Sequence, residues 1–397
     1  MAGWGGKWPR RLLMIACAAA IILFAARLYP PLRHPVDAAL LAQALFAGSK
    51  GGWLKKWTLP PERSPASLGK LELDLYRQSA ASGSAAGDVR GCVLLAHGMT
   101  DMGRRDPRLA DFAKNVARLG FAVAVPELPG MRRFRPDRRD ADRIAKSFTW
   151  MHNQFGRSGR RCGIFSFSFA AGPAMKAAVR SHVGPRVGYF IAVGAYLDLT
   201  AVLRHLTTGG KGNAPAFPGG PPVRVGKWLF LRYNMGLLGL INYEGEVEAI
   251  VRRKLADENA DVSSFTARLP VRVRKLLSLI GNRDPAKFDE LLRAQPEELR
   301  VRLDGWSVRA DISKTAMPIF LLHGRSDPFV PFSESMRLAE RARRRKGGSG
   351  RVRLLITDGF AHVDPEIGKA GPGFRSLLNA FRFVGFLSDV LTAMEGE

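Results

Sequence analysis

The sequence of 397 residues has few cysteines and none of the common signatures of metal or nucleotide binding. Three cysteines, Cys17, Cys92 and Cys162, are too few for a small domain held together by disulfides. Zinc-finger spacing, a glycine-rich nucleotide-binding loop and internal repeats are also absent. The sequence therefore predicts neither a metal centre nor a cofactor, while its 46% hydrophobic content is that of an ordinary folded protein.

Acidic residues are scarce relative to basic ones. The chain has 61 Lys and Arg against 35 Asp and Glu, a formal net charge of +26. Such a surplus favours anionic surfaces, either phospholipid headgroups or nucleic acid. No basic run alternates with stacking aromatic residues, so nucleic acid is not expected as a partner. A membrane partner stays open, beside the simpler interpretation of a solvated basic surface.

The longest apolar run, LLMIACAAAIILFAA, lies near the N-terminus at 12–26. As a helix it spans about 22 Å, and Leu28 and Tyr29 extend it toward the roughly 30 Å of a bilayer's hydrocarbon core. Trp4 and Trp8 precede it, as in interfacial aromatic belts. No small-x-small cleavage site follows it, which favours an uncleaved single-pass anchor over a signal peptide. The side of the membrane on which the rest of the chain lies is left open.

Two shorter segments follow this run. DAALLAQALFAG (37–48) has the pattern of an amphipathic helix, and GWLKKW (52–57) places tryptophans around a lysine pair. Both suit a membrane headgroup surface, and both equally suit a linker folded onto the next domain. Pro60, Pro61 and Pro65 then indicate a domain boundary.

From residue 70 onward, short apolar strands alternate with helical patterns. Strands are expected at 70–76, 92–98, 121–128, 162–168, 189–197, 319–324 and 352–357, and helices at 107–119, 138–155, 170–181, 333–345 and 373–394. This order predicts an α/β fold, with a mostly parallel central sheet flanked by helices. Residues 199–312 break the alternation and are predicted to form an inserted helical cap over a substrate pocket, or else a plain helical subdomain.

Four parts of the chain are therefore predicted: an N-terminal membrane anchor (1–34), a juxtamembrane linker (35–66), an α/β core (67–198 and 313–397) and the helical cap (199–312). In a parallel sheet, reactive side chains collect at the carboxyl ends of the strands. The segment FSFSFAAG (165–172) lies at such an end, where a buried strand precedes a helix.

Two serines in this segment compete as the candidate nucleophile. A nucleophilic serine on a sharp strand-to-helix turn needs small residues two positions before and two positions after it. Around Ser168 these positions hold Ser166 and Ala170, which are both small. Around Ser166 they hold Ile164 and Ser168, and isoleucine is too bulky. Ser168 is therefore the predicted nucleophile.

The residues around Ser168 resemble the nucleophile elbow of the α/β-hydrolase fold, particularly its dienelactone-hydrolase-like and cap-bearing serine esterase branches. LLHGRSDPFVP resembles the segment that presents the acid, which implies Asp327, and GFAHVD resembles the histidine loop, which implies His362 as general base. LLAHGMTD resembles the oxyanion loop, which implies that the backbone N–H groups of Met99 and Phe169 receive the oxyanion.

The resemblance covers about 70–200 and 313–395. Two departures from the family pattern are visible: the elbow lacks glycine at both flanking positions, and Pro173 falls in the helix that follows.

Other residues near the strand ends receive lesser roles. Asp198 is the reserve acid, because some hydrolases of this fold place the acid after that strand. His97 and His323 precede glycines at strand ends and are expected to be structural. In the sheet order that the resemblance implies, Cys92 and Cys162 begin neighbouring strands. A disulfide is conceivable in an exported domain, but buried thiols are favoured.

The predicted function is that of a membrane-anchored serine hydrolase, which cleaves a carboxylic ester or thioester through an acyl-enzyme. The anchor and the apolar helix at 227–241 indicate a lipophilic small-molecule acyl substrate. Two alternatives stay open: a catalytically inactive hydrolase-fold binding protein, and an acyltransferase that uses the same triad.

Overall fold

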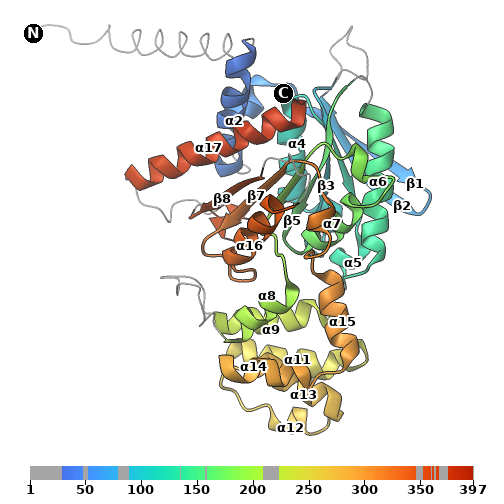
Figure 1. Cartoon of the computed structure of the whole chain (residues 1–397), viewed down its shortest axis with the longest axis vertical. Coiled ribbons are helices and arrows are strands. Elements are labelled where there is room, and N and C mark those ends of the chain that lie inside the picture. Colours follow the sequence, from blue (N-terminus) through green and yellow to red (C-terminus); the bar gives the residue numbers. More distant parts are fainter. Residues whose placement is uncertain are drawn as a thin grey trace, which may run out of the picture.

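The computed structural model describes residues 29–47, 52–78, 89–134, 136–156, 159–208, 223–345, 352–358, 360–361, 364–365 and 374–396. They form a central sheet covered by helices on both faces, with a block of further helices beside one end of the sheet (Figure 1). The apolar run at 12–26 lies outside the described residues. Within those residues, no helix is both long and apolar enough to cross a bilayer.

The central sheet has eight strands in the order β1-β2-β4-β3-β5-β6-β7-β8. β2 is antiparallel to both β1 and β4, and the other neighbours are parallel. The strands are β1 Pro61–Leu68, β2 Leu71–Gln78, β3 Cys92–Ala96, β4 Ala122–Pro126, β5 Cys162–Phe167, β6 Phe190–Val193, β7 Ile319–Gly324 and β8 Val352–Thr357. The inner strands carry apolar side chains on both faces, and helices cover both faces. The predicted α/β fold is therefore confirmed.

Strand β1 is not predicted by the sequence pattern, because its prolines indicate a boundary. Proline lacks the N–H that a ladder hydrogen bond requires, so it is confined to edge strands and to first strand residues. β1 is an edge strand that pairs only with β2, and Pro61 is its first residue. The sheet therefore begins within the segment that was predicted as a linker.

Helices pack on the sheet in two layers. One face carries α5 (Pro129–Arg132), α6 (Arg139–Phe155), α7 (Ala171–Ala178) and α16 (Phe332–Arg343), and the other carries α4 (Pro107–Arg118) and α17 (Phe374–Glu395). Strand side chains alternate between these layers, so Leu94 joins the first core and Leu95 the second.

Between β6 and β7 the chain forms the block of helices that Figure 1 shows below the sheet. Its members are α8 Leu199–Thr208, α9 Val223–Tyr233, α10 Met235–Leu238, α11 Glu244–Ala256, α12 Ser263–Thr266, α13 Val271–Gly281, α14 Phe288–Arg293 and α15 Glu297–Trp306. This helical block, as it is called below, lies in the span predicted as a cap.

Helix α2 (Pro30–Ala47) packs against α17, beside which Figure 1 shows it. Glu395 of α17 accepts a hydrogen bond from Nε of Arg90 and contacts His34 at 2.6 Å, while Arg90 also binds Asp37 of α2 at 2.5 Å. Apolar residues of α2 are buried in the core that α4 and α17 share. Of the two interpretations of 37–48, a segment folded onto the domain is therefore confirmed.

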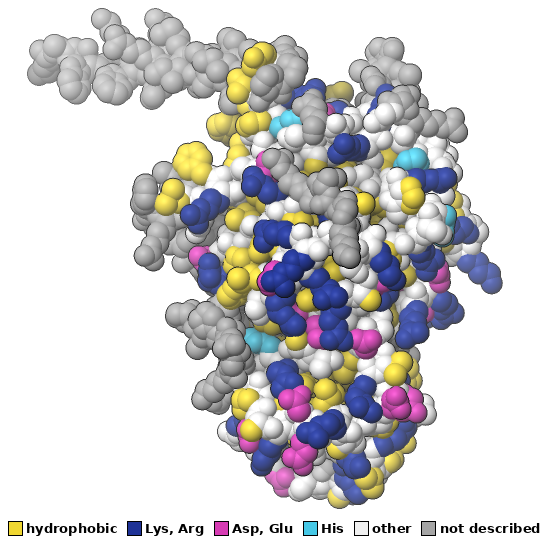
Figure 2. All heavy atoms as spheres, in the orientation of Figure 1, with side chains coloured by type: hydrophobic (Ala, Val, Ile, Leu, Met, Phe, Trp, Pro, Cys, Tyr) yellow, Lys and Arg dark blue, Asp and Glu magenta, His cyan; other side chains and the backbone are white. Residues whose placement is uncertain are grey.

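Apolar side chains remain exposed near α2. Figure 2 shows Lys and Arg over much of the visible face, with hydrophobic side chains beside α2. Tyr29 and Leu32 at the start of α2 are 58% and 48% exposed. Trp53 and Trp57, at the two ends of α3 (Trp53–Trp57), are also about half exposed, at 51% and 46%.

Cys92 and Cys162 form a disulfide, so the prediction of buried thiols is wrong. The two residues are direct partners in the parallel register of β3 and β5, and their Cα atoms lie 4.4 Å apart. Direct partners point to the same face of a sheet, which places the two sulfurs side by side.

Loss of this disulfide is expected to lower the free energy of unfolding by about 4 kcal/mol, because it joins residues 70 positions apart. Urea unfolding of a Cys92→Ala/Cys162→Ala variant against the wild type measures the difference. In protein purified without reductant and then unfolded, only Cys17 should react with a thiol reagent. Reaction at all three cysteines would contradict the pairing.

Candidate active site

Ser168 stands on a sharp turn between β5 and α7. β5 ends at Phe167, residues Ser168–Ala170 form one 3-10 turn, and α7 begins at Ala171. Ser168 has a φ of +53°, a left-handed conformation that costs a non-glycine residue about 1–2 kcal/mol. Among the described non-glycine residues, only Phe134 shares a positive φ. The serine is therefore held in a strained position at the carboxyl end of a central strand.

Small neighbours leave room for this turn. Ser166, two residues earlier, is fully buried, and its hydroxyl lies 3.4 Å from the carbonyl oxygen of Ile191 in β6. Ala170, two residues later, is also buried. Pro173 is the third residue of α7, where the backbone N–H has no partner within the helix, so the proline removes no bond.

The loop after β3 passes directly against the turn. A Cβ atom on Gly98 would lie 3.1 Å from the carbonyl oxygen of Phe167 and 3.4 Å from Cβ of Ser168, so a larger residue would force the loop away. Met99 and Phe169, the two predicted oxyanion-hole residues, line the same cavity as Ser168. The structure thus brings these three residues together.

His97 holds this loop through both ring nitrogens. Its Nε2 accepts the backbone N–H of Leu128 at 3.1 Å, which leaves the proton on Nδ1 to be donated to the Gly98 carbonyl at 2.8 Å. Burial lowers the pKa of His97, which favours this neutral form. These contacts match the structural role expected of it.

Asp327, the predicted acid, lies in the turn after β7 and is buried. Its Oδ1 accepts the backbone N–H groups of Phe329 and Val330 at 2.8 and 2.9 Å. Its Oδ2 lies 3.3 Å from Nε2 of His323, whose Nδ1 contacts the Ser335 hydroxyl at 2.7 Å. The carboxylate is therefore fixed at the carboxyl edge of the sheet.

His362, the predicted base, lies outside the described residues. On either side of it, β9 (Phe360–Ala361) pairs with β10 (Asp364–Pro365), and β9 packs beside β7, the strand that leads to Asp327. Besides His323, His205 of α8 also lies near Asp327. Burial lowers the pKa of His205, and the charge of the Asp327 carboxylate raises it by a smaller amount.

Asp198, the reserve acid, makes contacts of another kind. Its Oδ1 accepts the backbone N–H of Thr200 at 2.9 Å, at the start of α8, and its Oδ2 lies 3.0 Å from Nη1 of Arg309. Glu334 accepts the backbone N–H of Asp198 at 2.8 Å. The structure thus engages Asp198 in a helix cap and an ion pair.

A cavity of about 840 Å³ adjoins Ser168, which is within the range of small-molecule sites. The loop after β3, the start of α4, the ends of β5 to β7, and α2, α9 and α17 all contribute to its wall. The sequence pattern could not predict it, because periodicity assigns helices to a layer and says nothing of the gaps between them.

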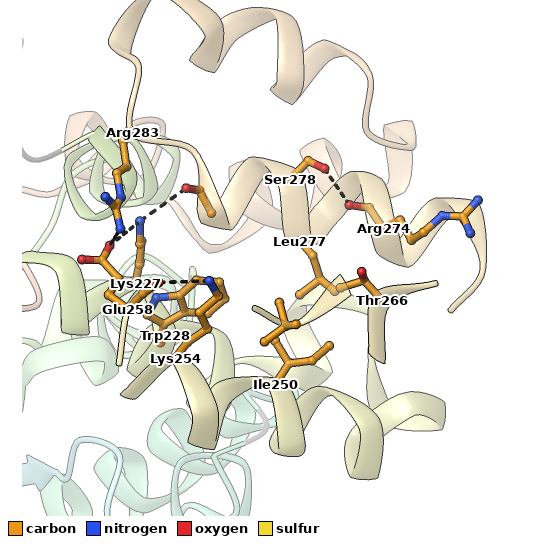
Figure 3. A pocket seen from close by; sticks show the side chains of 12 residues that line it. Lys227, Trp228, Ile250, Lys254, Glu258, Thr266, Arg274, Leu277, Ser278 and Arg283 are labelled. Carbon is orange, nitrogen blue, oxygen red and sulfur yellow. Dashed lines mark hydrogen bonds and ion pairs between the residues drawn. The ribbon is translucent and has the colours of Figure 1, made fainter. Parts of the chain in front are cut away.

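A second cavity, of about 350 Å³, lies within the helical block (Figure 3). Lys227 and Arg283 both point toward Glu258, with nitrogen–oxygen distances of 3.2 and 2.9 Å. Burial lowers the pKa of Lys227, an effect that Glu258 partly offsets. An ion-pair cluster of this kind accounts for the buried lysine, and the residues lining this cavity do not include a strand end.

Asp106 is a residue that positions the predicted oxyanion loop, and the sequence patterns did not single it out. Its Oδ1 accepts the backbone N–H of Arg108 at 3.0 Å and so caps α4, while its Oδ2 accepts the Thr100 hydroxyl at 2.9 Å. Thr100 follows Met99, so Asp106 ties the predicted oxyanion loop to the helix. The signal that could have found it is the Asp-Pro pair at 106–107, since both residues favour a helix start.

Asp106→Ala is expected to lower the free energy of unfolding by about 1 kcal/mol at neutral pH, through loss of the cap. Burial alone would raise the pKa of Asp106, but hydrogen bonds from Arg108 and Thr100 lower it overall. The contribution of the carboxylate is therefore complete above the ordinary aspartate pKa and is lost as the pH falls through the lower folded pKa.

Urea unfolding at pH 7 and at pH 3 measures this effect, and the difference between variant and wild type should shrink at pH 3. Asp111→Ala is the matched control in the same helix, because Asp111 is half exposed and its ion pair with Lys114 is long, at 3.7 Å. Equal losses in the two variants at pH 7 would contradict the capping role.

The strand order, the antiparallel β2 and the serine turn after β5 are those of the α/β-hydrolase fold, and the chain has this fold. No protein-family model and no curated protein matches the sequence. Solved structures similar to this chain include an esterase from Pyrococcus furiosus, at 14% identity and a TM-score of 0.40, with 83% of this chain and 90% of that chain covered.

Two further structures show a similar level of likeness. Dienelactone hydrolase from Anabaena variabilis has 14% identity and a TM-score of 0.40, over 83% of this chain and 97% of that one. Acylaminoacyl peptidase from Pyrococcus horikoshii has 12% identity and a TM-score of 0.42, over 78% of this chain and 38% of that one. The chain thus matches less than half the length of that peptidase. The strand order and the serine turn define the fold.

Proposed function

We propose that the protein is a serine hydrolase that cleaves a carboxylic ester or thioester through an acyl-enzyme. The observation that carries this proposal is the left-handed Ser168 at the end of β5, beside a cavity of ligand size. A strained residue persists only where its surroundings hold it in place, and such residues cluster at active sites. Ser166 is a poorer nucleophile because the sheet encloses its hydroxyl.

In the proposed reaction, Oγ of Ser168 attacks the acyl carbonyl carbon while His362 takes the serine proton. The N–H groups of Met99 and Phe169 receive the oxyanion. The bond to the leaving alkoxide or thiolate then breaks, and His362 protonates that group. Water repeats the sequence on the acyl-enzyme and releases the acid. Asp327, held by two backbone N–H groups, orients His362.

Ser168→Ala is expected to lower kcat/KM for a short p-nitrophenyl ester by about 10⁴-fold or more, because the nucleophile is lost. Ser166→Ala is the matched control and should keep most of the activity. A fluorophosphonate should label the wild type at Ser168. An unlabelled protein without esterase activity would favour the inactive binding protein, and the reverse ranking of the two variants would move the nucleophile to Ser166.

The same assay distinguishes the two histidines. His362→Ala should lose activity to the same degree as Ser168→Ala, while His205→Ala keeps most of it. The opposite result would make His205 the base, since it lies within the field of Asp327. Product analysis with added alcohols separates a hydrolase from an acyltransferase.

We also propose that the apolar run at 12–26 holds the protein at a membrane. Its length and apolarity support this, as do the exposed Tyr29 and Leu32 close to it in sequence. The full chain is expected to stay in the membrane pellet after extraction with alkaline carbonate. Release into the supernatant would overturn this location and leave the hydrolase proposal unaffected.

A further inference from the structure

The cavity at Ser168 extends along the sheet face that α4 and α17 cover. Phe167 lies next to the serine, and Phe165 is the next residue of β5 on the same face. Helix α17 runs toward the amino ends of the strands, where Glu395 binds Arg90 just before β3. Val390 of α17, five residues before Glu395, also lines the cavity.

Helix α2 closes this part of the cavity on the outside. It contacts both α4 and α17, and its Ala44 and Leu45 belong to the cavity wall. The rings of Phe46 in α2 and Phe383 in α17 meet edge to face, with centroids 5.6 Å apart. We call the space between β5–β7, α4, α17 and α2 the inner cavity.

The central strand β5 shows that the protein's own side chains do not fill this space. Phe165 and Phe167 are only partly buried, although strands in the middle of a covered sheet normally bury their side chains. Their rings stack at 4.8 Å, and Phe112 of α4 packs edge to face against both, yet one side of the cluster faces the cavity. Apolar side chains that face empty space lose packing contacts, so a site of this kind is stabilised by an apolar ligand.

Charged groups enter the cavity wall from one part of the chain only. Among the described lining residues, those with charge come from the loop after β3 and the start of α4, namely Asp101, Asp106, Arg108 and Asp111. Every lining residue contributed by β5 to β7, α2 and α17, apart from Ser168 at the strand end, is apolar, whereas α4 contributes Asp111 and Asn115 beside the apolar Leu109 and Phe112. A polar group placed among the apolar residues would find no hydrogen-bond partner, whereas a hydrocarbon chain needs none.

We infer that the inner cavity binds the hydrocarbon chain of a long-chain fatty acyl ester or thioester. The inference rests on the proposed function, because the acyl carbonyl must sit at Ser168 for its chain to enter beside Phe167. The leaving group then lies on the outer side, near Tyr233 and Asn234 at the end of α9. Hydrolysis releases a free fatty acid.

A series of p-nitrophenyl esters with acyl chains of increasing length tests this in the full-length protein. From the butanoyl ester upward, kcat/KM is expected to rise by about fourfold per added methylene, as long as each added methylene contacts apolar residues of the cavity wall. The rise should continue to the dodecanoyl ester or beyond. A kcat/KM that falls after the butanoyl ester would overturn the inference, and the proposed hydrolase would stand.

Two variants that fill the inner cavity locate the chain. Val390→Trp in α17 and Ala44→Trp in α2 should each lower the ratio of dodecanoyl to butanoyl kcat/KM by at least about tenfold. Leu378→Trp is the matched control in α17, because Leu378 is 40% exposed and is not among the lining residues. Its ratio should equal that of the wild type. Equal ratios in all variants that melt cooperatively would place the chain elsewhere and overturn the inference.

Binding without turnover separates the two proposals. Ser168→Ala is titrated with dansylaminoundecanoic acid, and dansyl fluorescence should rise on binding in a manner that Val390→Trp or Ala44→Trp in the same background abolishes. Binding by Ser168→Ala, combined with a wild type that hydrolyses no ester, would retain the hydrocarbon site and reject the hydrolase. Ester hydrolysis without binding of the probe and without a chain-length preference would retain the hydrolase and reject the hydrocarbon site.

Discussion

A serine at a φ of +53° needs support on every side, and here the support comes from segments that are distant in sequence. Gly98 lets the loop after β3 approach the turn, and a Cβ atom on Gly172 in α7 would lie 2.4 Å from the Tyr196 hydroxyl. The usual glycines of the elbow are replaced by Ser166 and Ala170, and glycine is instead required in the surrounding segments that press against it. The position of the serine hydroxyl therefore depends on the packing of the loop after β3 and of Tyr196, which follows β6. The disulfide joins β3 to β5, the strands that lead to this loop and to the serine.

The two faces of the sheet are packed in different ways. Below α6 and α7, small and large apolar residues fill the interface, with Ala170, Ala174 and Ala177 fully buried. Below α4 and α17 the interface opens into the inner cavity, and α2 covers the gap. One face thus stabilises the strand and helix that hold Ser168, and the other provides space that a substrate can occupy.

The strands and the serine turn could be predicted from sequence because both depend on local patterns. Buried parallel strands appear as short apolar runs, and the small residues around Ser168 are within two positions of it. The remaining features depend on contacts between distant segments. The pairing of Cys92 with Cys162 requires the register of β3 and β5, and the position of α2 requires Glu395, more than 350 residues later. Strand β1 was missed because its prolines are tolerated only at an edge, which sequence alone does not identify. The placement of His362 and the run at 12–26 stay predictions.

The contact of His34 with Glu395 joins residues 361 positions apart, and Arg90 is 305 positions from the same carboxylate. A ribosome makes α2 long before it makes α17, so α2 emerges without the helix against which its apolar face packs. Until α17 has been made, this face has no packing partner there, and the wall of the inner cavity closes only when α17 docks. The order of synthesis thus delays the cavity beside the serine until α17 has followed every other element of its wall.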